Sequence, residues 1–409
     1  MSAQKPNVLM VAHMSDLHYA NETLKEVDKC FGHAVDKAIE ANVDVAVISG
    51  DSTDHKLDMH SPAVIALANQ IRRLSDHCPV LMLQGTFSHE PPGTLDIFRL
   101  VGGKYPVFVA DRLCQVALMG KQWLASHDWC FPDDFHLQSM DALFTCIPTV
   151  NKAVVAAAVG VESAAEAVGD HVSALLAGYG VSNAAARSMG KPTIGVSHGT
   201  ISGCLTEHGV PMDGLDHEFS TGSLFGAKAS AFMIGHIHAH QYWDNGSHKI
   251  AYPGSIGRLH HGEIDPKGFL IWEVSAEKSE FDFIHTPARK MIDLVFPGVP
   301  DMDAIKAASA DVEGAFVRVR WSVDEEHRNA VDRKAIESLL SSAAKVQMEG
   351  RILPVIRTRA EGMNKETSLL GKLTKWSQVT GTDSNGLDVR LESLLSNDPE
   401  KIVEDILAY

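Results

Sequence analysis

The sequence predicts a layered α/β fold in which polar side chains gather at one edge of a sheet. Two observations lead to this prediction. Apolar runs of strand length alternate with helical patterns within the first hundred residues, a rhythm typical of sheets covered by helices. Each of these runs is followed by a loop that contains Asp or His. Because the strands of such a sheet end at a common edge, we expect these side chains to lie close together.

The elements of this first segment are expected in the order strand, helix, strand, helix, strand, at Val8–His13, Leu24–Ala41, Val43–Ser49, Ser61–Leu74 and Pro79–Leu83. The middle strand is apolar throughout, which predicts that it is buried on both faces. Gly50 then permits a sharp turn. Asp51 is therefore expected at the carboxyl end of a central strand, where a carboxylate has little structural reason to be.

The same domain is expected to continue to residue 288. Its further strands are predicted at Val107–Val109, Gln115–Met119, Thr193–Ser197, Ala231–Ile234, Gly268–Val274 and Glu280–Thr286. The alanine-rich stretch Asn151–Ala186 has apolar residues at helical spacing. We interpret it as a helical insertion at about residues 150–190 that covers the sheet.

The pattern changes near residue 289. Residues 289–362 are expected to form a small α+β domain with a strand at Val317–Val323, a helix at Arg333–Ala344 and a second strand at Arg351–Arg359. Residues 363–409 are expected to be amphipathic helical segments that bind a partner.

Composition and charge narrow the class of protein. The chain has 409 residues, 45% of them hydrophobic and 22% charged, which are values of an ordinary globular protein. The net charge of −16 argues against sequence-independent binding of nucleic acid over the whole surface. It leaves room for a local basic groove or a metal-assisted phosphate site.

Cysteine spacing and hydropathy predict the compartment. No two of the six cysteines form a CxxC pair, so we interpret them as reduced thiols of a cytoplasmic protein. The N-terminus has no signal-peptide pattern, and the most apolar long segment is interrupted by charges. We therefore expect no association with a membrane.

The candidate site consists of acidic and histidine residues that lie at or just beyond predicted strand ends: Asp16, His18, Asp51, His198, His236 and His238. The D-x-H and H-x-H spacings place alternate residues on one side of an extended turn. Mixed imidazole and carboxylate ligands suit manganese, iron or zinc, whereas an all-oxygen set would favour magnesium or calcium. Taken singly, a histidine in a chain with 21 of them is more simply a surface or core residue.

Six ligands exceed what one tetrahedral ion needs, so we expect two ions that share a carboxylate. Asp51, on the central strand, is the expected bridge. A two-metal centre stabilises the attacking and leaving oxygens in displacement at phosphorus. The residues therefore predict hydrolysis of a phosphoester.

The ordered series D-x-H, GDxxD, G-x-x-x-H-E (Gly85–Glu90), S-H-G and GHIH (Gly235–His238) resembles the calcineurin-like metallophosphoesterase superfamily. Within it, Ala251–Val274 resembles the Tyr-x-Gly-Ser…Gly-Glu…Lys-Gly-Phe segment of SbcD-type DNA nuclease subunits. The resemblance implies a metallophosphoesterase sandwich of two mixed sheets flanked by helices. A small α+β capping domain and C-terminal helices would follow.

The resemblance also implies roles for individual residues. One ion would be held by Asp16, His18, Asp51 and His238, the other by Asp51, His198 and His236. His89 would protonate the leaving oxygen or steady the phosphate, and Asp54 would orient a ligand histidine.

The sequence departs from the family where a GNHD asparagine would complete the second ion's ligands. It reads GTFSHE instead, and Ser88 falls at the asparagine position if His89 matches the motif's histidine. Thr86 is the alternative if the gap is placed differently. A hydroxyl is a poorer neutral ligand than an amide oxygen, so the second ion is expected to be held less firmly.

The resemblance further implies two Mn²⁺ ions, with Fe²⁺, Zn²⁺ or Mg²⁺ as alternatives. It implies 3′-to-5′ exonuclease activity on double-stranded DNA, endonuclease activity on single strands, a homodimer, and action in DNA repair and recombination with an SbcC-like coiled-coil ATPase. Candidate contacts to DNA are the basic residues Arg258, Lys267, Arg318 and Arg320. Two alternatives stay open: a phosphatase or small-molecule phosphodiesterase with the same site, and a structural subunit with a weakened site.

Overall fold

The computed structural model describes residues 7–132, 137–149, 164–206, 218–354, 362–396 and 398–407. The chain divides into two compact units. The first spans Met1–Leu294, Asp303–Val319 and Glu337–Gln347, and the second spans Val295–Met302, Arg320–Ile336 and Met348–Tyr409.

The first large sheet has six strands in the order β15-β14-β1-β2-β3-β4. Strands β1 to β4 are parallel, and β14 and β15 complete the sheet in antiparallel pairs. Their bounds are Leu9–Met14 (β1), Val45–Ile48 (β2), Val80–Leu83 (β3), Val107–Ala110 (β4), Gly268–Val274 (β14) and Ser279–His285 (β15). The predicted strands of the first hundred residues are confirmed, and β2 is buried along its whole length.

The second large sheet has seven strands in the order β12-β13-β11-β8-β7-β5-β6. Its central strands β7, β8, β11 and β13 are parallel, and the outer strands are antiparallel. The bounds are Cys114–Met119 (β5), Gln122–Ala125 (β6), Ala142–Ile147 (β7), Thr193–His198 (β8), Ala231–Gly235 (β11), Gln241–Asp244 (β12) and Lys249–Tyr252 (β13). The prediction of two mixed sheets is confirmed.

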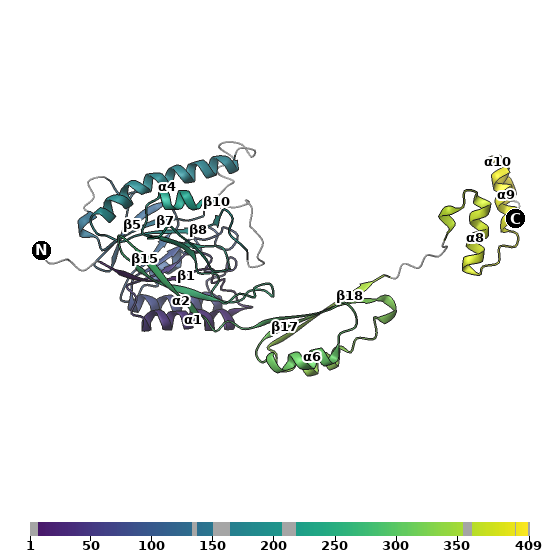
Figure 1. The fold of residues 1–409 in the computed structure, drawn as a ribbon, viewed down its shortest axis with the longest axis horizontal. Helices are drawn as coiled ribbons and strands as arrows, with labels where there is room; N and C mark the ends of the chain where they lie inside the picture. Colours follow the sequence, from purple (N-terminus) through teal and green to yellow (C-terminus); the bar gives the residue numbers. More distant parts are fainter. Residues whose placement is uncertain are drawn as a thin grey trace. The chain divides into compact units, whose positions relative to one another are not determined.

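Helices cover the outer faces of the two sheets (Figure 1). Helices α1 (Leu24–Glu40) and α2 (Pro62–His77) pack on the first sheet through apolar residues at helical spacing. Helices α4 (Ala164–Ser188) and α5 (Thr221–Gly226) lie over the second. A separate core, which includes Val47, Phe144 and Trp272, fills the space between the sheets. The site-bearing loops therefore start from strands that are buried on both faces.

The remaining elements include a two-stranded sheet of β9 (Thr200–Ile201) and β10 (Glu218–Phe219). A three-stranded sheet has the order β16-β17-β18, with bounds Met291–Phe296, Phe316–Asp324 and Lys345–Leu353. Helices α6 and α7 cover Met302–Ala308 and Arg333–Leu339, and helices α8, α9 and α10 cover Leu369–Thr380, Leu387–Ser396 and Pro399–Leu407. The described part of the chain contains no helix with the length and hydropathy that a membrane span requires.

Two predicted boundaries were wrong. Helix α7 ends at Leu339 rather than Ala344, and β18 begins at Lys345 rather than Arg351. The reason is tertiary: Ser342 accepts a hydrogen bond from Gly314, and Ala344 donates one to Ala315, so this backbone pairs with the turn before β17. The alanine-rich insertion is helical from Ala164, whereas residues 150–163 lie outside the described residues.

Candidate metal centre

Four of the six predicted ligands lie on sharply turned backbone beyond the carboxyl ends of strands. Positive φ angles occur at Asp16 (51°), His18 (50°), Asp51 (50°) and His236 (105°). Such angles are uncommon outside glycine, and they concentrate at functional sites. Backbone hydrogen bonds hold the turns, since Asp16 donates to the carbonyl of Gly50 and His18 donates to that of Asp51. The two loops therefore brace each other before any ligand binds.

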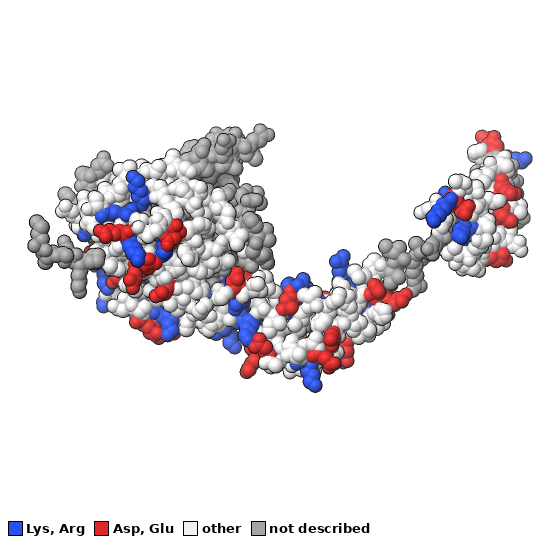
Figure 2. Space-filling view, viewed as in Figure 1, with Lys and Arg blue, Asp and Glu red and all other residues white. Residues whose placement is uncertain are grey.

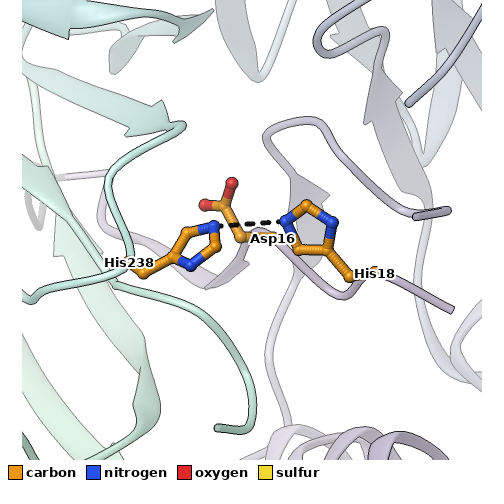
Figure 3. Close-up of side chains that lie close together, drawn as sticks. All are labelled: Asp16, His18 and His238. Atoms are coloured by element: carbon orange, nitrogen blue, oxygen red, sulfur yellow. Dashed lines mark hydrogen bonds between the residues drawn. The ribbon is translucent and has the colours of Figure 1, made fainter. Parts of the chain in front are cut away.

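The first group of ligands is Asp16, His18 and His238, drawn in Figure 3. Their ligand atoms lie within 4.8 Å of one another. The Nε2 atoms of His18 and His238 are 3.2 Å apart, and the carboxylate of Asp16 lies beside them. Asp16 is 0% and His18 is 3% exposed. The Asp16 carboxylate also accepts hydrogen bonds from the backbone of His236, which links the first group to the GHIH turn.

The second group is Asp51, His198 and His236, whose ligand atoms also lie within 4.8 Å of one another. Nδ1 of His198 donates to the carbonyl of Ser49 at 2.8 Å, which leaves Nε2 facing Asp51 at 3.2 Å. Burial favours the neutral ring, but the Asp51 carboxylate outweighs it and raises the pKa of His198 to about 9. In turn, burial raises the pKa of Asp51 and the His198 ring lowers it more, so the carboxyl is ionised.

Asp51 belongs to the second group and not to the first. The ring of His18 nevertheless helps to lower the pKa of Asp51, and Asp16 helps to raise that of His198. The two groups therefore lie within electrostatic reach of each other. The bridging role of Asp51 stays a prediction.

Close packing at two glycines brings the second group together. A Cβ atom on Gly85 would lie 2.2 Å from Oδ1 of Asp51, and one on Gly50 would lie 2.3 Å from Nδ1 of His198. Both contacts are closer than real Cβ atoms allow. These positions require glycine because a ligand side chain passes directly over the backbone.

The structure places Thr86, rather than Ser88, beside the second group. The Thr86 hydroxyl is 3.0 Å from Oδ2 of Asp51 and 3.2 Å from Nε2 of His198, and its backbone amide donates to Asp51 at 2.7 Å. Ser88 is exposed. These contacts favour Thr86, the alternative placement of the gap, and Ser88 as a metal ligand stays a prediction. The difference is local, since Thr86 is the third residue after β3 whereas Ser88 lies in the turn that follows.

Thr86→Val is expected to weaken divalent-metal binding at the second group by about tenfold, because it removes the hydroxyl but keeps the shape of the side chain. Ser88→Ala is the matched control and should bind metal as the wild-type protein does. Calorimetric titration with Mn²⁺ measures both. Equal loss in the two variants, or loss only in Ser88→Ala, would contradict the placement.

His89 and Asp54, the predicted catalytic residues, lie beside His18. The rings of His18 and His89 meet edge to face at 4.7 Å, and Nδ1 of His89 donates to the backbone carbonyl of Asp54. Oδ1 of Asp54 is 3.5 Å from Nδ1 of His18, and this ring lowers the pKa of Asp54 to about 2. Asp54 is 47% exposed. It stands where an orienting carboxylate for His18 is expected, although its role stays a prediction.

A cavity of about 420 Å³ opens beside these residues. It is lined by His18, Ala20, Glu22, Thr23, Asp54, His55 and Leu259. The cavity borders the first group at His18.

Glu90, the last residue of GTFSHE, links the loop that carries Asp51 to the loop that carries Thr86. It is fully buried, and its two oxygens accept the backbone amides of Ser52 and Gly85 at 2.5 and 2.6 Å. Burial and the nearby charge of Asp51 raise the pKa of Glu90 to about 7.

Glu263 is a residue that the sequence reasoning missed. Its Oε1 lies 3.0 Å from Nδ1 of His238, and its Oε2 pairs with Lys267 at 2.8 Å. The signal was present in the Gly-Glu…Lys-Gly segment, but its Lys was assigned to DNA. Lys267 is only 3% exposed and cannot contact a nucleic acid there. That prediction was wrong because the charge is used inside the fold.

Arg258 is also used inside the fold. Its guanidinium donates to the backbone carbonyls of Glu263, Asp265 and Arg289 at 2.9, 2.9 and 3.0 Å. A guanidinium with this many carbonyl partners secures a loop and has little capacity left for phosphate. The structure therefore argues against a DNA contact here.

Arg318 and Arg320, two residues apart, lie on the same face of β17, as predicted. Arg318 pairs with Asp293 through Nη2 at 2.8 Å. Arg320 lines a cavity of about 340 Å³ together with Trp321 and Arg351. Their contact with DNA stays a prediction.

The residues of both groups fit a pair of divalent ions. Each group offers imidazole nitrogen and carboxylate oxygen from two buried side chains and one half-buried histidine, and these atoms converge within 4.8 Å. This donor set matches Mn²⁺, Fe²⁺ or Zn²⁺.

The metal-free protein is expected to lose stability as the pH rises from about 7 to about 9. The pKa of His198 is raised to about 9 from 6.5, and that of His238 is also raised, so the folded state keeps protons that the unfolded state releases. His13, whose pKa burial lowers to about 3, is neutral in both states in this range. Urea unfolding in chelator at several pH values measures the effect. A stability that rises over this range, or the same slope in His198→Asn, would contradict the assignment.

The functional assignment of this protein rests on the site itself, because the comparisons with known proteins found only distant similarity. No protein-family model and no curated protein matches the chain. A conserved uncharacterized protein from Streptococcus pneumoniae TIGR4, called a predicted phosphoesterase, is 12% identical over 68% of this chain and 90% of its own, with a TM-score of 0.28. A dimetal phosphatase from Danio rerio is 9% identical over 67% of this chain and 98% of its own, with a TM-score of 0.40.

Proposed function

We propose that this protein hydrolyses phosphoesters with the help of two divalent metal ions, and that its substrate is the backbone of DNA. The observation that carries the proposal is the convergence of Asp16, His18 and His238 in one group and of Asp51, His198 and His236 in another. The members come from loops that lie far apart in the sequence. Neighbouring pairs of metal sites built from such residues are suited to displacement at phosphorus.

The ions, when bound, supply Lewis-acid stabilisation of charge on the phosphoryl oxygens and activation of water. The protein supplies the placement. Asp51 and His198 hold each other in line, and the Ser49 carbonyl fixes the His198 tautomer. His89 donates from Nδ1 to the Asp54 carbonyl, so its Nε2 is the nitrogen that can carry a proton to the leaving oxygen.

The DNA substrate is supported by the ordered motif series and by the segment Ala251–Val274, with its resemblance to SbcD-type nucleases. Arg318 and Arg320, on one side of β17, are the remaining candidates for backbone contacts. The proposal includes Mn²⁺ as the metal, a homodimer, and an SbcC-like ATPase as partner. Helices α8 to α10 are the proposed docking segment, because many of their apolar side chains are exposed.

A small phosphomonoester or phosphodiester is the second candidate substrate. It is favoured by the internal use of Lys267 and Arg258, which removes two of the four candidate DNA contacts. The net charge of −16 points the same way. On the face that Figure 2 shows, Lys and Arg are interspersed with Asp and Glu rather than gathered in one basic patch.

The test compares three substrates with Mn²⁺: labelled duplex DNA, a small aryl phosphodiester and an aryl phosphomonoester. We expect the protein to cleave DNA faster than it hydrolyses the small diester. We also expect it to co-purify with a large ATPase. Preference for either small substrate would support the second candidate. Full metal occupancy without hydrolysis of any substrate would overturn both and support a structural subunit. The same assay includes Asp51→Asn, which removes a candidate metal ligand. Its control is Glu277→Gln, which removes an exposed negative charge on the turn between β14 and β15.

A further inference from the structure

The strongest unassigned feature is a closed ring of polar contacts around His238. Three buried side chains take part besides His238: Glu263, Lys267 and Ser255. The ring starts at Nδ1 of His238, passes through Glu263 to Lys267, and returns to the backbone carbonyl of His238. Both the side chain and the main chain of one candidate ligand are therefore held by the same structure.

Glu263 is the member that touches the imidazole. It is 0% exposed, and its Oε1 is 3.0 Å from Nδ1 of His238. His260 approaches the same oxygen at 3.4 Å from the solvent side. Oε2 accepts from the backbone amide of Leu259 at 3.1 Å and faces Ser255 at 3.4 Å. A buried carboxylate with this many donors is ionised and rigid.

Lys267 binds both the Glu263 carboxylate and the backbone of His238, the candidate metal ligand. Its ammonium group has three N–H donors and three partners: Oε2 of Glu263 at 2.8 Å, the hydroxyl of Ser255 at 2.9 Å and the carbonyl of His238 at 2.8 Å. None of these donors remains for a substrate. The position thus explains why a lysine lies buried next to a candidate metal site.

Two other candidate ligands have weaker supports. Nδ1 of His18 faces Asp54 at 3.5 Å, and this carboxylate is 47% exposed. His198 is held by a neutral backbone carbonyl. A carboxylate behind an imidazole fixes its tautomer and increases its basicity as a ligand. Of these three histidines, His238 has the most firmly held carboxylate.

We infer that Glu263 and Lys267 are positioning residues that fix the ring and tautomer of His238, and that they thereby set the affinity of the first group for a divalent ion. This inference rests on the proposed function only in so far as the first group binds metal. Glu263 keeps Nδ1 of His238 protonated, so that Nε2 presents its lone pair to the ion. Lys267 keeps Glu263 ionised and in place.

A double-mutant cycle tests the inference through metal binding. Glu263→Gln, Lys267→Met and the double variant are titrated with Mn²⁺ by calorimetry and unfolded in urea. Glu263→Gln is expected to weaken one of the two sites by about 10–100-fold and to leave the other unchanged. The double variant is expected to recover stability, since no unpaired charge remains, but not metal affinity. Lys249→Met, at a partly exposed ion pair on β13, is the control.

The outcome that overturns the inference is equally specific. Metal affinity that recovers together with stability in the double variant would show a structural role alone. Unchanged affinity in Glu263→Gln would also overturn it.

A metal-free readout separates this inference from the proposed function. The ¹⁵N shifts of His238 are expected to show protonated Nδ1 in the wild-type protein and a mixture of tautomers in Glu263→Gln. If the wild-type protein bound no metal, the proposed function would fail. The tautomer of His238 would still show whether Glu263 positions its ring. An identical tautomer in both proteins would overturn the positioning role, whatever the protein hydrolyses.

Discussion

Asp51→Asn is expected to lower phosphoester hydrolysis by on the order of 10³-fold. The substitution removes a carboxylate that would hold a metal ion, and such an ion stabilises the transition state at phosphorus by several kcal/mol. Asn keeps the shape of the side chain and can still accept the Thr86 amide, so the fold should survive. His198 also loses the carboxylate partner that faces its Nε2 at 3.2 Å, so its ring is held less firmly. Initial rates with the best substrate in Mn²⁺, together with metal stoichiometry, measure the effect.

The control for this substitution is Glu277→Gln, which removes an exposed negative charge elsewhere and should retain full activity. Far-UV circular dichroism of Asp51→Asn verifies that the fold is intact. Hydrolysis that survives in Asp51→Asn, with both ions still bound, would refute the mechanism. It would also remove the reason for treating Asp51 as the centre of the site.

Glu90→Ala is expected to destabilise the protein by roughly 2–6 kcal/mol, because it leaves two buried backbone amides, those of Ser52 and Gly85, without an acceptor. Ser52 follows Asp51 and Gly85 precedes Thr86, so metal binding at the second group should weaken as well. Urea unfolding gives the loss of stability. Glu90→Gln retains one acceptor oxygen and should fall between Ala and the wild-type protein. A Glu90→Ala protein as stable as the wild type would show that these loops do not depend on this side chain.

The two mixed sheets were predicted only through the family resemblance. The candidate ligands follow strands of both sheets, whereas the pattern alone had predicted one edge of a single sheet. The sequence itself was sufficient to predict that Asp and His side chains at strand ends converge. The reason is that strand ends and their D-x-H or H-x-H spacings are local signals, while the common edge of parallel strands supplies the long-range geometry. Loops with an insertion were less predictable. In GTFSHE two hydroxyls compete for one position, and only the course of the chain after β3 selects Thr86 over Ser88.

Basic residues were the least predictable feature. Lys267 and Arg258 look like surface charges in the sequence, and their burial depends on partners that the fold brings to them. A lysine is buried only when its charge is paired, and pairing is a tertiary property. The same limit explains the shifted boundary between α7 and β18, where hydrogen bonds to Gly314 and Ala315 override local helix propensity.

The linkage between Asp16 and the GHIH turn has a consequence for the order in which the molecule assembles. The backbone of His236 binds the carboxylate of Asp16, and His18 meets His238, in both cases across 220 positions of chain. Contacts of such long range close after local strand–helix units have formed, because the loop entropy must first be overcome. During refolding, helical signal should therefore return before the capacity to bind metal. A divalent ion would therefore bind and stabilise the folded protein after its long-range contacts have formed, and would not nucleate folding.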